Sequence, residues 1–222
     1  MSRVVIDIET LAFPLDVHDD VQQEYLMRFA TTPEEREEAL LKLNLYAPTA
    51  RVLAIGMLNP DTNGGRVYLD APNVQPWESD DGSVQFIPSD ESHLLENFWK
   101  DLTPYRQIIT FNGRGFDCPF LLLRSSLLGV RPSRNLMGNR YDTRGHIDLL
   151  DQLTFYGATR KFNLDFYCKA YDIESPKSHG VSGLDLGGLV EQGKFREIAE
   201  YCLGDVQATA ELFVKWERTL SF

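Results

Sequence analysis

A short run near the N-terminus, RVVIDIET, constrains the fold more than any other part of the chain. The branched apolar residues of this run favour a buried β-strand, yet Asp7 and Glu9 place two carboxylates in it. Side chains two apart in a strand share one face, so we expect these two about 7 Å apart along the chain. Such a pair is costly in a core unless it is protonated, paired or bound to a cation. The run therefore predicts either a strand end that reaches solvent or a cation site.

Length and composition limit the class of protein. The 222 residues fit one α/β domain with an insertion, so we predict a single domain over residues 1–222. The sequence contains no run of about 20 apolar residues and no secretory leader, which predicts a cytoplasmic protein without a membrane partner. The net charge of −11 argues against broad attraction to nucleic acid, although a local site could still hold it. The three cysteines are predicted to be reduced core residues: Cys118, Cys168 and Cys202.

Hydrophobic patterning predicts strands first and helices later. We expect an antiparallel meander of the N-terminal strand with strands at 51–58 and 66–70. Residues 71–90 are rich in Pro, Asp and Ser and are predicted to be a loop. The remaining elements are expected to be a helix at 92–102, a strand at 106–111, a buried helix at 116–129, a strand or helix start at 146–150, and helices at 162–171 and 194–216.

A polar, acidic insertion separates the first two strands. It runs from about Pro14 to Pro48 and is predicted to contain one helix, Thr32–Asn44. Thr32 is a typical N-cap, followed by proline at the first helical position and by Glu35 at the position of a capping box. The insertion could cover a cleft, influence the length of strand that binds, or dock a partner.

Two further segments carry candidate functional residues. Tyr201 and Asp205 lie one helical turn apart, on the flank of the apolar stripe of the C-terminal helix. Asn112 follows an apolar strand, and Asp117 begins the next helix. Each has a structural explanation, because asparagine favours turns and aspartate favours the first helical turn. Strand ends are nevertheless where α/β sheets build their sites.

Together, the segments VIDIET, NGRGFD and YCLGD resemble the three motifs of the DEDD exonuclease superfamily. The residue that would be histidine in the histidine branch is Glu200, so the tyrosine branch is favoured. The sequence of these motif segments is most similar to that of the proofreading exonuclease domain of family-B DNA polymerases. We expect the present chain to be a free-standing domain of this kind. The resemblance implies an α/β, ribonuclease H-like fold, with a central mixed sheet (antiparallel first three strands, then parallel) flanked by helices.

The same resemblance implies a catalytic site. Two divalent cations, Mg²⁺ or Mn²⁺, would be held by four carboxylates, those of Asp7, Glu9, Asp117 and Asp205. Tyr201 would orient the attacking water. The residues implied to contact the substrate are Thr10, Leu11, Asn112 and Phe116.

The implied activity is 3′-5′ exonucleolytic release of 5′-mononucleotides from the 3′ end of single-stranded nucleic acid, with DNA favoured. An exoribonuclease or oligoribonuclease of the same fold is the first alternative, and an inactive nucleic-acid-binding module is the second. A polymerase or DNA repair partner stays open. Cations in predicted loops could also reach phosphates, namely Arg114, Arg160, Lys161, Lys177 and His179. His146 and Asp148 fit either the rim of the cleft or a buried structural role.

Overall fold

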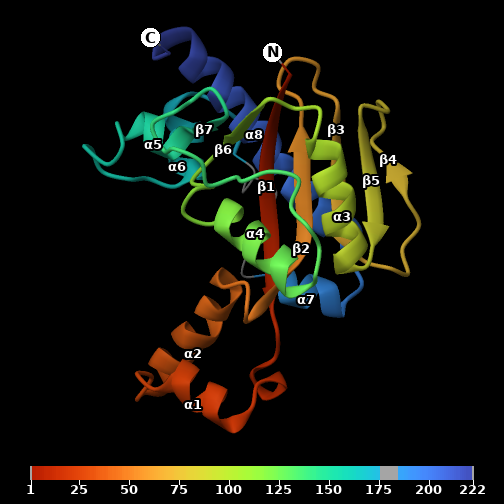
Figure 1. Ribbon diagram of the computed structural model, residues 1–222, viewed down its shortest axis with the longest axis vertical. Helices are drawn as coiled ribbons and strands as arrows, with labels where there is room; N and C mark the ends of the chain where they lie inside the picture. Colours follow the sequence, from red (N-terminus) through yellow and green to blue (C-terminus); the bar gives the residue numbers. More distant parts are fainter. Residues whose placement is uncertain (1, 176–184, 222) are drawn as a thin grey trace.

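A computed structural model describes residues 2–175 and 185–221. Within these ranges seven strands form one sheet, in the order β4-β5-β3-β2-β1-β6-β7 (Figure 1). The strands are β1 (Arg3–Ala12), β2 (Ala50–Leu58), β3 (Gly65–Asp70), β4 (Trp77–Glu78), β5 (Val84–Ser89), β6 (Gln107–Thr110) and β7 (His146–Asp148). β1, β2 and β3 are antiparallel neighbours, and β6 and β7 continue parallel to β1. This mixed sheet confirms the ribonuclease H-like arrangement.

Helices cover both faces of the sheet and divide the apolar core in two (Figure 1). α3 (Glu91–Leu102) and α4 (Asp117–Leu127) pack over Ile6 and Ile8 of β1, whereas α8 (Phe195–Thr219) packs on the opposite face. The other helices are α1 (Asp20–Met27), α2 (Pro33–Lys42), α5 (Leu149–Leu153), α6 (Leu164–Ala170) and α7 (Leu186–Glu191), with short 3-10 turns at Leu15–Val17 and Leu43–Leu45. The alternation along β1 thus decides which side chains face α8.

The predicted loop at residues 71–90 is wrong. It contains β4 and β5, and β5 runs parallel to β3 while β4 is antiparallel to β5. Val84 and Phe86 are buried, and the ring of Trp77 stacks on that of Phe86 with centroids 4.7 Å apart. Burial of these side chains outweighs the turn-forming composition around them.

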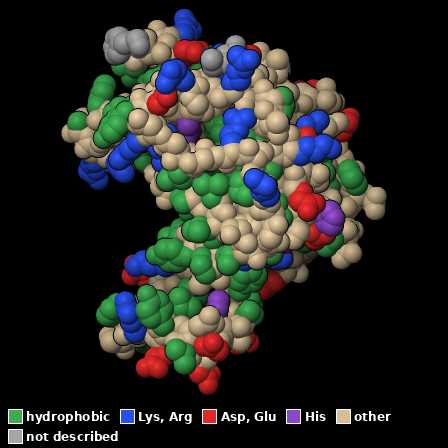
Figure 2. Space-filling model, in the orientation of Figure 1, with side chains coloured by type: hydrophobic (Ala, Val, Ile, Leu, Met, Phe, Trp, Pro, Cys, Tyr) green, Lys and Arg blue, Asp and Glu red, His purple; other side chains and the backbone are tan. Residues whose placement is uncertain are grey.

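The insertion forms a projecting arm of two helices instead of the one that was predicted (Figure 1). α2 has the expected capping box between Thr32 and Glu35, and its last turn continues as the 3-10 turn. The missed helix α1 has a capping box of its own, in which Asp19 and Gln22 cap each other. Figure 2 shows a hollow between the arm and the body of the molecule, with apolar side chains on both of its walls. Apolar residues that the arm exposes are Val17, Val21, Tyr25, Phe29, Leu40, Leu41, Leu45 and Tyr46.

Two further expectations, for the cysteines and for residues 146–150, agree with the structure. All three cysteines are buried and unpaired. The segment 146–150 is both a strand and a helix start, since β7 leads directly into α5. Among the described residues, no helix is both long and apolar enough to cross a membrane.

A nearly buried ion pair joins α3 to α4. Arg124 donates from Nε and Nη2 to the two oxygens of Glu91, each at 2.8 Å. Glu91 also accepts from the backbone N–H of Val52, and the guanidinium of Arg124 lies over the ring of Phe13 at the base of the arm. One ion pair therefore fastens two helices, the central strand β2 and the start of the arm.

Replacing one member of this pair is expected to destabilise the fold. Arg124→Met leaves the Glu91 carboxylate uncompensated, which should lower the free energy of unfolding by about 3–5 kcal/mol in urea denaturation. The double variant Glu91→Gln/Arg124→Met should recover part of this loss, because the glutamine oxygen still accepts from Val52. A single variant as stable as the parent would show that the pair does not hold these elements together.

Candidate active site

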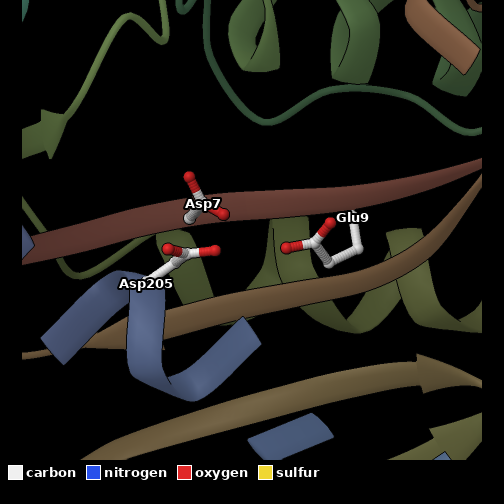
Figure 3. Close-up of side chains that lie close together, drawn as sticks. All are labelled: Asp7, Glu9 and Asp205. Carbon is white, nitrogen blue, oxygen red and sulfur yellow. The ribbon is translucent and has the colours of Figure 1, made fainter. Parts of the chain in front are cut away.

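Three carboxylates from two distant parts of the chain meet on the α8 face of the sheet. Asp7 and Glu9 project from β1, and Asp205 projects from α8 toward them (Figure 3). One carboxylate oxygen of each residue lies within 4.8 Å of those of the other two. The apolar neighbours of β1, Ile6 and Ile8, point into the core on the other face. Alternation in β1 thus separates the acidic side chains from the apolar ones.

The close approach of α8 to the sheet brings Asp205 to this point. Gly56 of β2 lies beneath the helix, and a Cβ atom built on it would be 2.8 Å from Cγ1 of Val206. Cys202 and Val206 are fully buried on the same helical stripe. Because Gly56 has no side chain, the helix can lie close enough for Asp205 to reach the carboxylates of β1.

Asp117 lies beside this cluster but outside the group of three. It is the first residue of α4, is 3% exposed, and its Oδ1 accepts from the backbone N–H of Ile8 at 3.0 Å. That N–H lies between Asp7 and Glu9 in the chain, so the carboxylate is fixed next to them. The structure therefore brings three of the four expected ligands together and holds the fourth as their neighbour.

Burial and mutual repulsion disfavour the charged forms of these groups. The pKa values of Asp7 and Glu9 lie well above normal, first because of burial and then because of the surrounding carboxylates. Burial also raises the pKa of Asp117, to about 7, although its backbone hydrogen bonds oppose this shift. The cluster consequently favours a bound proton or a bound cation near neutral pH.

Tyr201 lies one turn before Asp205 and lines the same pocket. Burial, followed by the charge of Asp205, raises the pKa of its hydroxyl above the normal value of a phenol. The hydroxyl therefore stays protonated at neutral pH and can donate a hydrogen bond, but it is a poor base. The pocket has a volume of about 210 Å³ and is lined by Asp7, Phe111, Asn163, Leu164, Asp165, Tyr201 and Asp205.

Four of these lining residues were not identified from the sequence. Phe111 directly follows β6, and the other three form the start of α6, where the side chain of Asn163 caps the helix. Asp165 accepts hydrogen bonds from Lys169 and Ser175. The only sequence signal was the N-cap pattern at Asn163, which indicates a helix start and not a pocket.

The four residues expected to contact substrate do not line this pocket. Thr10 follows a β-bulge and donates its hydroxyl to the backbone of Asn44 in the arm. Leu11 is half-buried against the core on the α8 face. Both residues nevertheless follow Glu9 directly in β1.

Asn112 and Phe116 also make structural contacts. Asn112 has a left-handed backbone with φ of 61°, and its N–H donates to Asp148. Phe116 is half-buried, with its ring 5.7 Å from that of Phe120. The geometry therefore gives each a structural role, and their contacts with substrate stay predictions.

The remaining candidates separate into structural and exposed groups. Asp148 is buried and accepts from four backbone N–H groups, including that of Arg114, so it fixes the backbone of the middle motif. Arg160 lies over the ring of Phe162, and Lys161 is exposed. Lys177 and His179 fall outside the described residues.

Comparison with known proteins identifies relatives of the chain. Residues 78–220 match the sequence model of a family described as "Predicted 3'-5' exonuclease related to the exonuclease domain of PolB". This range contains the middle motif and α8, whereas Asp7 and Glu9 lie before it.

The chain is also similar to archaeal proteins named DNA polymerase 1. It is 27% identical to that of Saccharolobus solfataricus over 68% of the chain and 17% of the polymerase. It is 21% identical to that of Sulfolobus acidocaldarius over 81% of the chain and 20% of the polymerase. It is 22% identical to that of Sulfurisphaera ohwakuensis over 94% of the chain and 23% of the polymerase. The chain thus spans about a fifth of the length of these relatives.

The family match covers more than half of the chain and includes two of the three motif segments. The acidic cluster joins α8 to the first strand, and Asp117 of the middle motif lies beside it. The chain therefore belongs to the family of 3′-5′ exonucleases related to the exonuclease domain of PolB.

Proposed function

We propose that this exonuclease removes 5′-mononucleotides from the 3′ end of single-stranded nucleic acid, with DNA as the favoured substrate, by hydrolysis that depends on two divalent cations. The observation that carries the proposal is the convergence of Asp7, Glu9 and Asp205 within 4.8 Å, beside a pocket that Tyr201 also lines. DNA is favoured because the relatives are named as DNA polymerases.

The donor set fits Mg²⁺ or Mn²⁺. All three converging groups are carboxylates, and hard divalent cations prefer such oxygen ligands. Asp7, Glu9 and Asp205 would hold the cations, and Asp117 would contribute from its position beside them. When bound, the cations would supply a Lewis acid that activates water and stabilises the leaving oxygen.

The residues around the cluster divide the remaining work. Tyr201, protonated at neutral pH, donates a hydrogen bond that positions the attacking water. The pocket beside Asp205 receives the terminal nucleotide, and the ring of Phe111 is available to contact an apolar face of that nucleotide. Asp117 keeps the backbone of β1 in place through the N–H of Ile8 and so fixes the direction of the neighbouring carboxylates.

A 5′-labelled oligonucleotide tests the proposed reaction. With Mg²⁺ or Mn²⁺ the purified chain should shorten single-stranded DNA stepwise from its 3′ end, and EDTA should stop the reaction. Asp205→Asn should lower the rate by at least about 100-fold, more than an outer-shell change would. Glu200→Gln, an exposed change on the same helix, is the matched control and should leave the rate unchanged.

The same assay distinguishes the alternatives. A matched RNA oligomer should be shortened more slowly than DNA. Faster cleavage of RNA would establish the exoribonuclease instead. Binding of both oligomers without cleavage of either would establish an inactive binding module.

Removal of one acidic group should stabilise the metal-free protein. Because the folded-state pKa of Asp7 lies above the unfolded value, protonation stabilises the folded state, and this contribution is lost as the pH rises from about 4 through the raised pKa. Asp7→Asn should therefore raise the free energy of unfolding near pH 8 by about 1 kcal/mol or more, or the melting temperature by about 2–4 °C.

Thermal denaturation in EDTA measures the stability of the metal-free protein, and denaturation in Mn²⁺ measures the stabilisation by the cation. Mn²⁺ should stabilise the parent and fail to stabilise Asp7→Asn. Asp16→Asn, an exposed change in the arm, should alter neither value. A variant that is less stable than the parent in EDTA would contradict the repulsion argument.

Tyr201→Phe tests whether the phenol positions water or acts as a base. Loss of one positioning hydrogen bond should lower kcat by about 10- to 100-fold with little change in KM. The pH profile of the residual activity should keep the shape of the parent profile, because the phenol does not titrate in the working range. A pH limb that disappears in the variant would instead identify Tyr201 as a base.

A further inference from the structure

A second pocket lies on the face of the sheet opposite the carboxylate cluster. It has a volume of about 160 Å³ and is formed between β6, the start of β7 and the segment 134–145. Ile108, which lines it, belongs to the core beneath α3 and α4, whereas Asp7 faces α8. Three arginines line this pocket, namely Arg106, Arg114 and Arg134.

Within the part of the chain that the structure describes, these arginines have no acidic partner. Among the ion pairs of residues 2–175 and 185–221, none joins a carboxylate to Arg106, Arg114 or Arg134. Asp142 also lines the pocket, but its carboxylate pairs with Arg144 at 2.7 Å. The chain has a net charge of −11, so three arginines in one pocket make the local electrostatic potential opposite in sign to that of the whole chain.

Two of the arginines are held in place by neutral groups. Arg114 donates to the carbonyls of Gly138 and Asn139 at 2.9 and 3.2 Å. The Nη2 group of Arg134 donates to backbone carbonyls, including that of Leu102 at 3.1 Å. A guanidinium has five N–H donors, so both retain donors for a ligand while their positions are fixed. Burial also lowers the pKa of Arg134, which reflects the cost of its uncompensated charge.

A buried histidine adds a neutral donor to this wall. His146 is 6% exposed, and its Nε2 lies 2.9 Å from the hydroxyl oxygen of Thr110. If the hydroxyl donates to Nε2, the ring hydrogen is on Nδ1, which makes no hydrogen bond of normal geometry although the backbone of Leu136 lies near it. Burial and the charge of Arg114 lower the pKa of the ring to about 4, so it remains neutral.

We propose that this pocket is a binding site for a phosphate group. Arginine presents paired N–H donors that match the oxygens of phosphate. The guanidiniums of Arg114 and Arg134 are preorganised, which reduces the entropic cost of ordering them when a ligand binds. Lys and Arg side chains gather on the upper part of the face in Figure 2, whereas the arm below carries acidic groups. The phosphate could belong to a free anion or nucleotide, or to the backbone of a bound strand.

Binding in EDTA tests the proposal without the catalytic metals. Inorganic phosphate is titrated by calorimetry into the full chain, where the metal-free acidic cluster repels anions. We expect saturable binding that Arg106→Glu weakens by about tenfold or more, as loss of a charge-assisted hydrogen bond predicts. Arg106 has an exposed side chain, so the charge reversal does not disturb the core.

A neighbouring arginine supplies the matched control. Arg131→Glu makes the same charge change at an exposed position outside the pocket, and it should leave phosphate affinity unchanged. Absence of saturable binding, or equal weakening by both variants, would overturn the proposal. Neither result depends on whether the chain cleaves nucleic acid.

Two further ligands identify the source of the phosphate. If the site serves a strand, Arg106→Glu should weaken binding of a single-stranded oligomer in EDTA and reduce the salt dependence of log K by about one phosphate contact. If it serves a free anion, the variant should weaken binding of inorganic phosphate and of a 5′-mononucleotide but leave oligomer binding unchanged. Either pattern supports the site.

Discussion

Repulsion among acidic groups that the fold forces together is the constraint on which the rest of this structure depends. Asp7 and Glu9 must share a face because they are two apart in β1, and the packing of α8 over Gly56 adds Asp205 to the same space. Burial, followed by repulsion between the carboxylates, raises the pKa values of Asp7 and Glu9, so ionisation of the metal-free site is unfavourable. In the proposed mechanism a divalent cation would convert that repulsion into attraction, so the instability of the metal-free cluster would favour binding of the cation.

The arm is fastened to the site strand and is not a loose appendage. The side-chain oxygen of Asn44 accepts from the backbone N–H of Ala12, and the backbone carbonyl of Asn44 accepts from the hydroxyl of Thr10. Both contacts follow the bulge between Glu9 and Thr10, where β1 changes register. Arg124 completes the junction by donating to the carbonyl of Ala47. A force on the arm would thus be transmitted to the residues immediately after the first motif.

The sequence predicted the elements that its periodicity marks strongly. β1, β2 and α8 have sustained apolar patterns. The resemblance to the family motifs implied four acidic ligands, of which the structure groups three and places Asp117 beside them. β4 and β5 were missed because Trp77 and Phe86 are stabilised by each other, and no local signal reports that contact. The pocket wall at Asn163 was missed for the same reason, since α6 reaches Asp205 only through tertiary packing.

The separation of acidic and basic groups across the sheet has an electrostatic reason. Arginines placed beside Asp7 would form ion pairs with the carboxylates, and both charges would then be lost to metal and to phosphate. The apolar core beneath β1 and β6 keeps Arg114 and Arg134 on one face and the carboxylates on the other. The carboxylate cluster and the proposed phosphate site therefore present groups of opposite charge on opposite faces of the sheet. In a chain with a net charge of −11, affinity for phosphate has to be built locally from fixed cations, because the overall field opposes it.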